Sequence, residues 1–482
     1  MIRKTSGKLS LILAVVIAAG TLGACGESGG TPVSPQGYSS SAFEKIEDVQ
    51  TDSSRLGTTE ETESDGIETQ LILGDERFEQ YIPMLEGKRV ALFSNHSGIV
   101  GDECSFDYDA LGEGADLIHF GKDDKGNDVT YGEHVLDALI RQNVDVACVL
   151  SPEHGFRGTS DAGEGVDDSI DPATGVPLLS LYEDNRSKAV SEDTLETFDV
   201  LVVDIQDVGL RFYTYYITMF DLMDACSEHG KSVIILDRPN PNGFLVDGPI
   251  LQNELISNVG RLPIPVAHGM TLGELALMIN GEGWLQAGKD SCDLTVITCL
   301  GYDHNTMHYL IKPPSPNLKD MRAVYLYPST CLFENTVVSV GRGTEYPFET
   351  YGSPYLADMK EYDYNFIPVS MEGAVSPMYQ DKTCYGRDLR TIPLSDIRNN
   401  GLNLSYLIDA YNAINESSCE AVFWGPKYND GHYWIDYLMG TDNVRLMIED
   451  GKSAEKIKAS WKEELDDFKE KRRQYLLYTD FE

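Results

Sequence analysis

The sequence predicts an α/β protein in which a parallel-sheet domain with helices on both faces is followed by a smaller α+β domain. Short apolar runs of strand length, at residues 146–150, 200–204 and 232–236, alternate with segments of helical spacing. Each run leads into a cluster of polar residues. After about residue 298 this alternation weakens, and the proline-rich stretch 312–317 cannot continue a helix or a central strand. Strands that alternate with helices favour a parallel sheet with helices on both faces.

The expected elements follow in chain order. Residues 88–94 form the first predicted strand, which ends in a turn-forming sequence at 95–98. Helical spacing at 135–140 precedes the strand at 146–150, and a helix through 218–226 separates the last two strands. Near the end of the chain, residues 454–478 are predicted to form one amphipathic helix. Its apolar side chains at helical spacing are Ile457, Trp461, Leu465 and Phe468.

A chain of 482 residues is too long for one ordinary core, so we expect several parts. The predicted boundaries are a lipoprotein signal peptide with a lipobox at 1–25, a disordered acidic tether at 26–70, the parallel-sheet domain at 71–305 and the α+β domain at 306–482. The tether is rich in Ser, Thr, Gly and acidic residues, a composition that cannot bury enough apolar surface to fold.

The amino terminus has the features of an export signal. A basic stretch that includes Arg3, Lys4 and Lys8 precedes an apolar run at 11–19 that is too short to span a bilayer. The following sequence, Leu22-Gly-Ala-Cys25, resembles a bacterial lipobox. This pattern predicts lipid modification at Cys25 and an exported lipoprotein held on the extracytoplasmic face of the cell membrane. The alternative is an ordinary secretory signal followed by a chance cysteine.

The charge of the chain bears on its partners. A formal net charge of −40 excludes nucleic acid as an expected partner, because binding it requires clustered Lys and Arg.

The predicted strands lack a following G-x-G-x-x-G, so no dinucleotide is expected, and no G-x-S-x-G nucleophile motif is present. The histidines lack H-E-x-x-H or H-x-H spacing, so we expect neither a metal nor another cofactor.

Residues 151–158 carry the first candidate chemistry, because polar side chains beyond a buried strand line the ligand crevice of an open α/β sheet. Glu153 lies beside His154 and near Arg157, an environment that can adjust the pKa of a carboxyl group for acid or base catalysis. The alternative is a carboxylate that caps the next turn or pairs with Arg157. Glu164 is a possible second carboxylate, although a solvated loop acid is the favoured interpretation.

The stretch after residues 200–204 is the second candidate. Asp204 and Asp207 flank Gln206 and are able to hold a metal or divide acid and base roles. A structural pairing of Asp207 with Arg211 is the favoured alternative. The aromatic run 212–216 offers faces that stack on sugar rings, or serves as core. Farther along, the glycine-rich loop 339–345 carries Arg342 near Glu345 and Glu349, and is either a ligand loop or a turn with a surface arginine.

Seven stretches together resemble the YbbC/NamZ family of exo-β-N-acetylmuramidases, in the same order along nearly all of the expected ordered chain. Two departures concern residues 95–98, where the family more often has Asn-Pro-Thr-Gly, and a minor loop variant at 240–243. The stretches are residues 94–98, 151–158, 204–215, 236–241, 268–274, 313–317 and 341–344.

The resemblance implies that residues 71–305 form a Rossmann-like catalytic domain, with a cleft between it and the smaller α+β domain. It also implies release of terminal N-acetylmuramic acid from the non-reducing ends of peptidoglycan fragments. It makes Glu153 the leading catalytic carboxylate, with Glu164 or Asp207 as partner, or the 2-acetamido group of the substrate as nucleophile. An arginine is expected to bind the lactyl carboxylate of the sugar. The alternative function is a non-catalytic lipoprotein that binds muropeptides. The implied substrate-binding residues are Asn95, His154, Arg157, Gln206, Arg211, Tyr213, Arg238, Asn240, His268 and Arg342.

Overall fold

A computed structural model describes residues 70–482, apart from positions 113, 153–155, 157–167, 184–185, 287–290 and 418–421. The predicted signal peptide, lipidation site at Cys25 and acidic tether therefore lie outside the described residues, and they stay predictions. The described residues from 70 to 482 belong to one compact unit. No helix among the described residues is long and apolar enough to cross a membrane.

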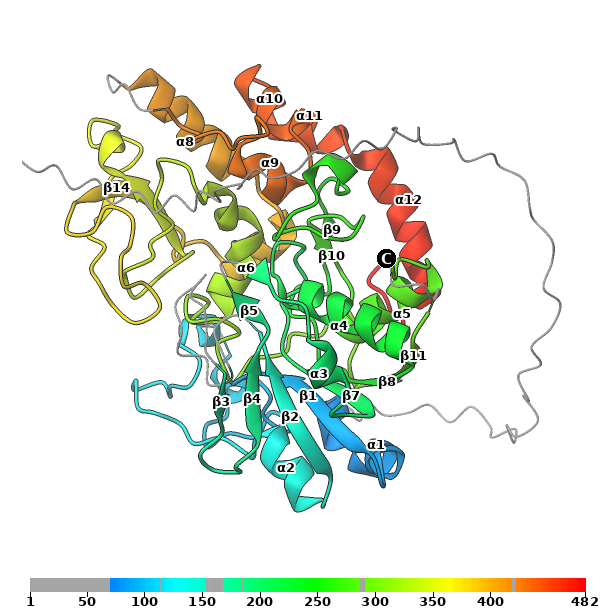
Figure 1. Ribbon diagram of the computed structural model, residues 1–482. Coiled ribbons are helices and arrows are strands. Elements are labelled where there is room, and N and C mark those ends of the chain that lie inside the picture. The colour runs from blue at the N-terminus through cyan, green and yellow to red at the C-terminus, as the bar shows by residue number, and fades with distance from the viewer. Residues whose placement is uncertain are drawn as a thin grey trace, which may run out of the picture. The chain divides into compact units, whose positions relative to one another are not determined.

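The main sheet has seven described strands in the order β11-β8-β7-β1-β2-β4-β3, and all are parallel except the edge strand β3 (Figure 1). Numbered along the chain, the parallel strands run 6-5-4-1-2-3, which is the Rossmann order. The strand order reverses between β1 and β7. The bounds are β1 Arg89–Ser94, β2 Asp145–Ser151, β3 Ser169–Ile170, β4 Pro177–Ser180, β7 Val200–Asp204, β8 Ser232–Leu236 and β11 Asp293–Ile297.

Helices cover both faces of this sheet because successive strand residues point to opposite sides. In β1, Val90 and Leu92 pack toward α1 (Phe78–Leu85) and α2 (Val135–Arg141). Ala91 and Phe93 belong to the core on the other face, which contains α4 (Tyr215–His229) and α5 (Leu272–Gly281). The strands 88–94, 146–150, 200–204 and 232–236 and the helices 135–140 and 218–226 are thereby confirmed.

The second part of the chain contains a three-stranded antiparallel sheet in the order β12-β14-β13, with helices beside it (Figure 1). Its apolar side chains join the core of one face of the parallel sheet. The predicted fold class is confirmed, whereas the boundary at 305/306 stays a prediction. The bounds are β12 Thr350–Ser353, β13 Tyr364–Phe366, β14 Cys384–Asp388, α6 Met321–Thr330, α7 Leu394–Asn400, α8 Ser405–Glu416, α9 Trp434–Met439 and α10 Asn443–Glu449. Shorter elements are α3 Glu192–Leu195, β5 Tyr182–Glu183, β6 Arg186–Ser187, β9 Val246–Asp247 and β10 Ala267–His268.

The prediction of a single helix at 454–478 is wrong, because the segment forms two helices, α11 (Ala454–Ala459) and α12 (Lys462–Arg472). Between them, the Ser460 hydroxyl donates to the carbonyl of Ile457 at 2.7 Å, a local bond that competes with helical bonding. The indole of Trp461 donates to Asp247 at 3.1 Å and anchors the break. The four predicted apolar side chains are nevertheless all buried.

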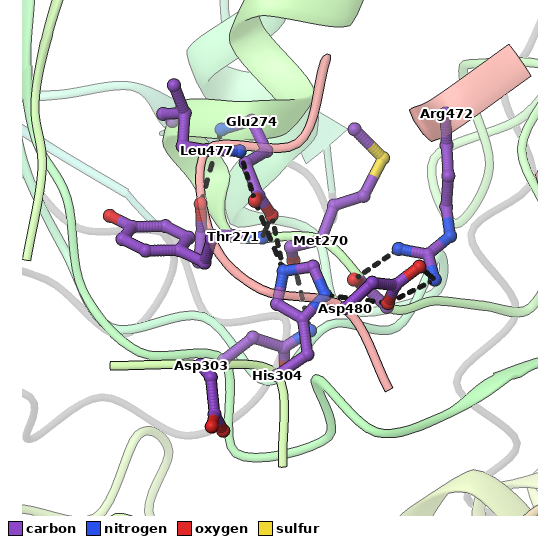
Figure 2. A network of polar contacts seen from close by, with 12 residues as sticks. Met270, Thr271, Glu274, Asp303, His304, Arg472, Leu477 and Asp480 are labelled. Carbon is purple, nitrogen blue, oxygen red and sulfur yellow. Dashed lines mark hydrogen bonds and ion pairs between the residues drawn. The ribbon is translucent and has the colours of Figure 1, made fainter. Parts of the chain in front are cut away.

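Residues 473–482, which we call the C-terminal strap, attach to the sheet domain through a buried polar network (Figure 2). The imidazole of His304 lies 3.0 Å from Glu274 and 3.0 Å from Asp480, and Asp480 also accepts from Arg472 at 2.8 Å. The backbone N–H of Leu477 donates to Glu274 at 2.8 Å. Burial lowers the pKa of His304, but the hydrogen bonds to Glu274 and Asp480 outweigh burial and raise it overall.

Candidate active site

The loops after β1 and β7 meet where the strand order reverses, the usual position of a ligand crevice in such a sheet. Asn95 follows β1, and its Oδ1 accepts from both the backbone N–H and the hydroxyl of Ser97, at 2.9 and 2.6 Å. The hydroxyl oxygen of Ser97 in turn accepts from the backbone N–H of Gln206, which follows β7, at 3.1 Å. Ser97 therefore connects the two strand ends and sets their relative position.

The proline-rich segment lies against these strand ends. The hydroxyl groups of Tyr213 and Tyr215 donate to the carbonyl of Pro314, at 2.6 and 2.9 Å. The Nε2 atom of His96 lies 2.6 Å from the carbonyl oxygen of Pro313. Segments more than 90 residues apart in the chain thus form one wall, which contains a predicted substrate-binding residue, Tyr213.

Asp207 is a buried carboxylate at this edge. Its Oδ1 accepts from the backbone N–H of Gly209 at 2.7 Å, whereas its Oδ2 has no hydrogen-bond partner among the described residues. Burial raises the pKa of Asp207 to about 7, against the opposing backbone hydrogen bonds of Gly209 and Val208. A carboxyl group that titrates near neutrality suits acid or base catalysis.

The prediction that Asp207 pairs with Arg211 is wrong. Arg211 is fully buried, and its guanidinium donates to the carbonyls of Pro249, Ile264 and Leu438 at 2.6 to 3.0 Å. These backbone oxygens accept hydrogen bonds from both Nη atoms of the arginine, whereas its buried Nε has no partner among the described residues. The predicted role of Arg211 as a substrate ligand stays a prediction.

Arg238 also faces the interior. It donates from Nε to Asp204 at 2.6 Å and from Nη2 to Asp75 at 2.5 Å, and the side chains of all three residues are nearly inaccessible to solvent. Burial, opposed by the charge of Arg238, raises the pKa of Asp75 above its ordinary value. Asp204 is therefore occupied by an ion pair rather than paired with Asp207.

Three further predicted substrate-binding residues make interior contacts. The amide of Gln206 donates to the carbonyls of Asp207 and Pro239 at 2.8 and 2.9 Å, and the amide of Asn240 donates to the carbonyl of Met270 at 3.0 Å. Burial, together with nearby Arg472 and Arg211, lowers the pKa of His268 to about 3, so the imidazole is neutral. These side chains shape the loops beneath the site.

Arg342 is the most solvent-accessible of the three described arginines that were predicted to bind substrate. Its guanidinium donates to Glu334 at 2.6 Å, and 28% of its side chain is exposed to solvent. Gly341 and Gly343 beside it adopt left-handed backbone conformations, with φ of 79° and 83°. The loop 339–345 is thus a tight turn that presents an arginine at the surface.

Glu349, beyond the glycine-rich loop, lies beside Asp320, whose charge acts on it. Both carboxyl groups are fully buried, and burial is the main reason that the pKa of each lies above its ordinary value. Burial and the neighbouring carboxylate raise the pKa of Glu349 strongly. Asp320 Oδ1 also accepts from the N–H of Ala323 and caps α6.

Glu153, His154, Arg157 and Glu164 lie outside the described residues, and their assigned roles stay predictions. Their described neighbours belong to the same sheet edge. Ser151 ends β2, which pairs directly with β1. The ring of Phe156 lies 4.8 Å from that of His134, whose Nε2 is 2.8 Å from the carbonyl oxygen of Asn95. Among the described residues, no group of three or more potential ligands is arranged to hold a metal ion.

Comparison with known proteins identifies the family. Models of the N-terminal and C-terminal parts of exo-β-N-acetylmuramidase NamZ match residues 125–322 and 325–478. The chain belongs to the NamZ family. It is 32% identical over 414 residues to the peptidoglycan β-N-acetylmuramidase NamZ of Bacillus subtilis, across 83% of this chain and 89% of that protein. The expected family and the expected class of enzyme, a glycoside hydrolase, are confirmed.

Comparison with solved structures supports the fold described above. A crystal structure of a DUF1343 family protein from Bacteroides fragilis is 48% identical, with a TM-score of 0.71, and the match covers 86% of this chain and all of that chain. A second DUF1343 structure from the same species is 25% identical, with a TM-score of 0.62, over 85% of this chain and 99% of that chain. The similarity to these DUF1343 structures therefore extends over both parts of the described unit.

Some residues of this candidate site were not predicted from the sequence. Ser97, Tyr215 and His134 connect the strand-end loops, yet none carries a signal of its own in the sequence. Ser97 and Tyr215 lie inside two of the stretches that resemble the family, residues 94–98 and 204–215, so proximity to a motif was the available signal. Asp75 lies outside every quoted stretch, and only its contact with Arg238 identifies it.

Proposed function

We propose that this protein is an exo-β-N-acetylmuramidase that releases terminal N-acetylmuramic acid from the non-reducing ends of peptidoglycan fragments. The observation that carries this proposal is the identity to the Bacillus subtilis peptidoglycan β-N-acetylmuramidase along 83% of the chain. The strand-end loops supply supporting evidence, because polar side chains converge there at the reversal of strand order.

In this proposal Glu153 is the acid that protonates the glycosidic oxygen as the bond to the sugar breaks. Its position in the chain, two residues beyond the end of β2, supports this role, because β2 lies next to β1 in the sheet. The bond that breaks is the one between the anomeric carbon of the muramic acid and the oxygen of the next sugar. Water supplies the hydroxyl group that replaces it.

Asp207 is our proposed second carboxylate, ahead of Glu164. Its unpaired Oδ2 and its pKa of about 7 suit a group that accepts a proton from the attacking water. In a substrate-assisted reaction the same oxygen would instead accept from the N–H of the 2-acetamido group and orient it for attack. Both versions require the Asp207 side chain to contact the bound sugar.

Recognition of the lactyl group requires a cation with two parallel donors, and arginine has that geometry. The guanidinium groups of Arg211 and Arg238 already bind interior oxygens, which leaves Arg157 and Arg342 as our proposed lactyl ligands. Arg342 pairs with Glu334 in the free protein, so binding of a lactyl carboxylate would compete with that pair.

We further propose export and membrane anchoring through a lipidated Cys25, based on the sequence that precedes it. Replacing Cys25 with Ala should move the full-length protein from the membrane fraction to the soluble fraction. It should also abolish incorporation of an alkyne-labelled fatty acid. Labelling that persists in the variant would contradict the anchor.

The decisive experiment compares the full chain with its Glu153→Gln variant on a chromogenic muramoside. We expect the variant to bind muropeptides with unchanged affinity while turnover falls by at least about a hundredfold. Glu133→Gln is the matched control, because Glu133 is a surface residue paired with Arg141. Binding by the wild-type protein without turnover would instead identify a muropeptide-binding lipoprotein.

A further inference from the structure

The ammonium group of Lys312 lies over the ring of Tyr131, with 3.6 Å between Nζ and the ring centroid. An ammonium this close to an aromatic ring is attracted by the negative face of the ring. Among the described residues, no hydrogen bond or ion pair involves this ammonium. The ring covers one side of it, so the N–H donors on the other side remain for a ligand.

Other cations of this region already have acidic partners. Lys319, in the same segment as Lys312, lies 3.8 Å from Glu345, and Arg342 lies 2.6 Å from Glu334. Lys312 is half-buried, and burial lowers its pKa without an opposing carboxylate among the described residues. A half-buried cation without a counter-ion favours an anionic ligand, because pairing compensates for the lost hydration.

This cation–ring pair belongs to the wall of the strand-end site. The residue after the lysine is Pro313, whose carbonyl oxygen lies 2.6 Å from Nε2 of His96. Tyr131 comes three residues before His134, whose Nε2 lies 2.8 Å from the carbonyl oxygen of Asn95. Three residues of extended chain span at most about 11 Å. Short chain segments therefore attach both members of the pair to the loop after β1.

The charge of the chain indicates which ligand requires such a cation. A net charge of −40 repels anionic sugars, so a site for one of them requires a local cation that is not already paired. Muramic acid carries a carboxylate on its lactyl group, whereas N-acetylglucosamine carries none. The two oxygens of this carboxylate allow it to accept from an ammonium and from an arginine at the same time.

We propose that Lys312, held over the ring of Tyr131, binds the lactyl carboxylate of muramic acid and so selects this sugar over N-acetylglucosamine. The choice of sugar rests on the proposed function, but the binding itself does not require hydrolysis. Loss of the ammonium should therefore weaken binding of the charged sugar and leave binding of the neutral sugar unchanged.

The test uses N-acetylmuramic acid and N-acetylglucosamine as probes in calorimetric titrations of the full chain. We expect Lys312→Gln to weaken binding of N-acetylmuramic acid at least tenfold and to leave binding of N-acetylglucosamine unchanged. Lys231→Gln is the matched control, because Lys231 lies over the ring of Phe198 at 5.2 Å, just before β8 and thus at the opposite edge of the sheet. Circular dichroism and thermal unfolding would check that both variants fold.

Further variants separate a contact with the ligand from a structural role. Tyr131→Phe keeps the ring and should keep the preference, whereas Tyr131→Leu should weaken binding of N-acetylmuramic acid severalfold. Lys312→Arg should hold the preference to a higher pH than the wild type, because the lysine loses its proton first. The phenol of Tyr131 stays neutral in this range, because burial raises its pKa.

The outcomes that overturn the inference are specific. They are equal binding of N-acetylmuramic acid by Lys312→Gln and the wild type, an equal loss for both sugars, and a loss confined to inorganic phosphate as a third probe. If no muramoside is hydrolysed but Lys312→Gln still weakens only N-acetylmuramic acid, the proposed function fails and the carboxylate site stands. If muramosides are hydrolysed and Lys312→Gln still discriminates fully, the inference fails and the proposed function stands.

Discussion

The hydroxyl of Tyr215 accepts from the side-chain amide of Asn95 at 3.0 Å and donates to the carbonyl of Pro314 at 2.9 Å. One side chain of α4 therefore joins the loop after β1 to the proline-rich segment. The two segments are otherwise remote in the sequence, so their relative position depends on such bonds.

We predict that Tyr215→Phe disturbs this wall without unfolding the protein. The variant loses the bonds to Asn95 and Pro314, each worth about 1 kcal/mol, and a loss of about 1 to 2 kcal/mol corresponds to a fall in kcat/KM of roughly five- to thirtyfold. Steady-state kinetics on a chromogenic muramoside would measure it. Tyr475→Phe is the control, because Tyr475 donates to Glu282 through the same kind of bond elsewhere. An equal loss of activity in both variants would argue against a specific role.

The Asp207 carboxyl should determine part of the pH dependence. Its pKa of about 7 predicts that kcat/KM changes across neutrality in the wild-type protein. Asp207→Asn should lower kcat at least about a hundredfold. The residual activity of this variant should no longer change with pH across neutrality. Asp193→Asn, at an exposed position of α3, serves as the control. If kcat/KM of Asp207→Asn still changes with pH near pH 7, another group is responsible for the titration.

Selection of the lactyl group should depend on Arg342. We expect Arg342→Gln to reduce the preference for a muramoside over the matching N-acetylglucosaminide by about tenfold, since a charged hydrogen bond is lost. The ratio of kcat/KM values for the two glycosides is the measurement. Arg141→Gln removes an exposed arginine that pairs with Glu133 and should leave the ratio unchanged. If Arg342→Gln also leaves it unchanged, Arg157 becomes the remaining candidate of the two.

The C-terminal strap should contribute strongly to stability through Asp480. Asp480→Asn removes the carboxylate shared by His304 and Arg472, and breaking a buried ion pair costs roughly 3 kcal/mol. Chemical denaturation would measure the free energy of unfolding. Glu482→Gln, at a more exposed pair with Lys469, should cost less than about 1 kcal/mol. Similar losses in the two variants would mean that the network in Figure 2 is not a major source of stability.

Alkaline pH should destabilise the fold through Glu349. Its folded-state pKa is raised, so its contribution is fully present below the ordinary value of 4.5 and is lost as the pH rises through the raised pKa. Glu349→Gln replaces the protonated acid with a neutral amide and should flatten the fall in unfolding free energy above neutral pH. Glu345→Gln, at an exposed position of the neighbouring loop, should leave the profile unchanged. Parallel profiles for Glu349→Gln and the wild type would contradict this assignment.

Local pattern was sufficient to predict much of the fold. The strands at 89–94, 145–151, 200–204 and 232–236 are read from apolar runs, because each is buried on both faces of a parallel sheet. Asn95, Gln206 and Asp207 were placed at one edge because the carboxyl ends of parallel strands coincide. At 454–478 the apolar spacing was read correctly, but the break at Ser460 depends on a side-chain bond that periodicity does not reveal.

The sequence by itself determined the family, the alternating architecture and the edge of the sheet at which polar residues collect. Only the tertiary structure decided which partners those residues have. Arg211 lies four residues from Asp207, yet it binds carbonyls as distant as that of Leu438, and Arg238 binds Asp75 at the start of the described chain. The physical reason is that a buried charge or donor must be satisfied by whatever group the folded chain brings beside it, and that group is seldom a neighbour in sequence.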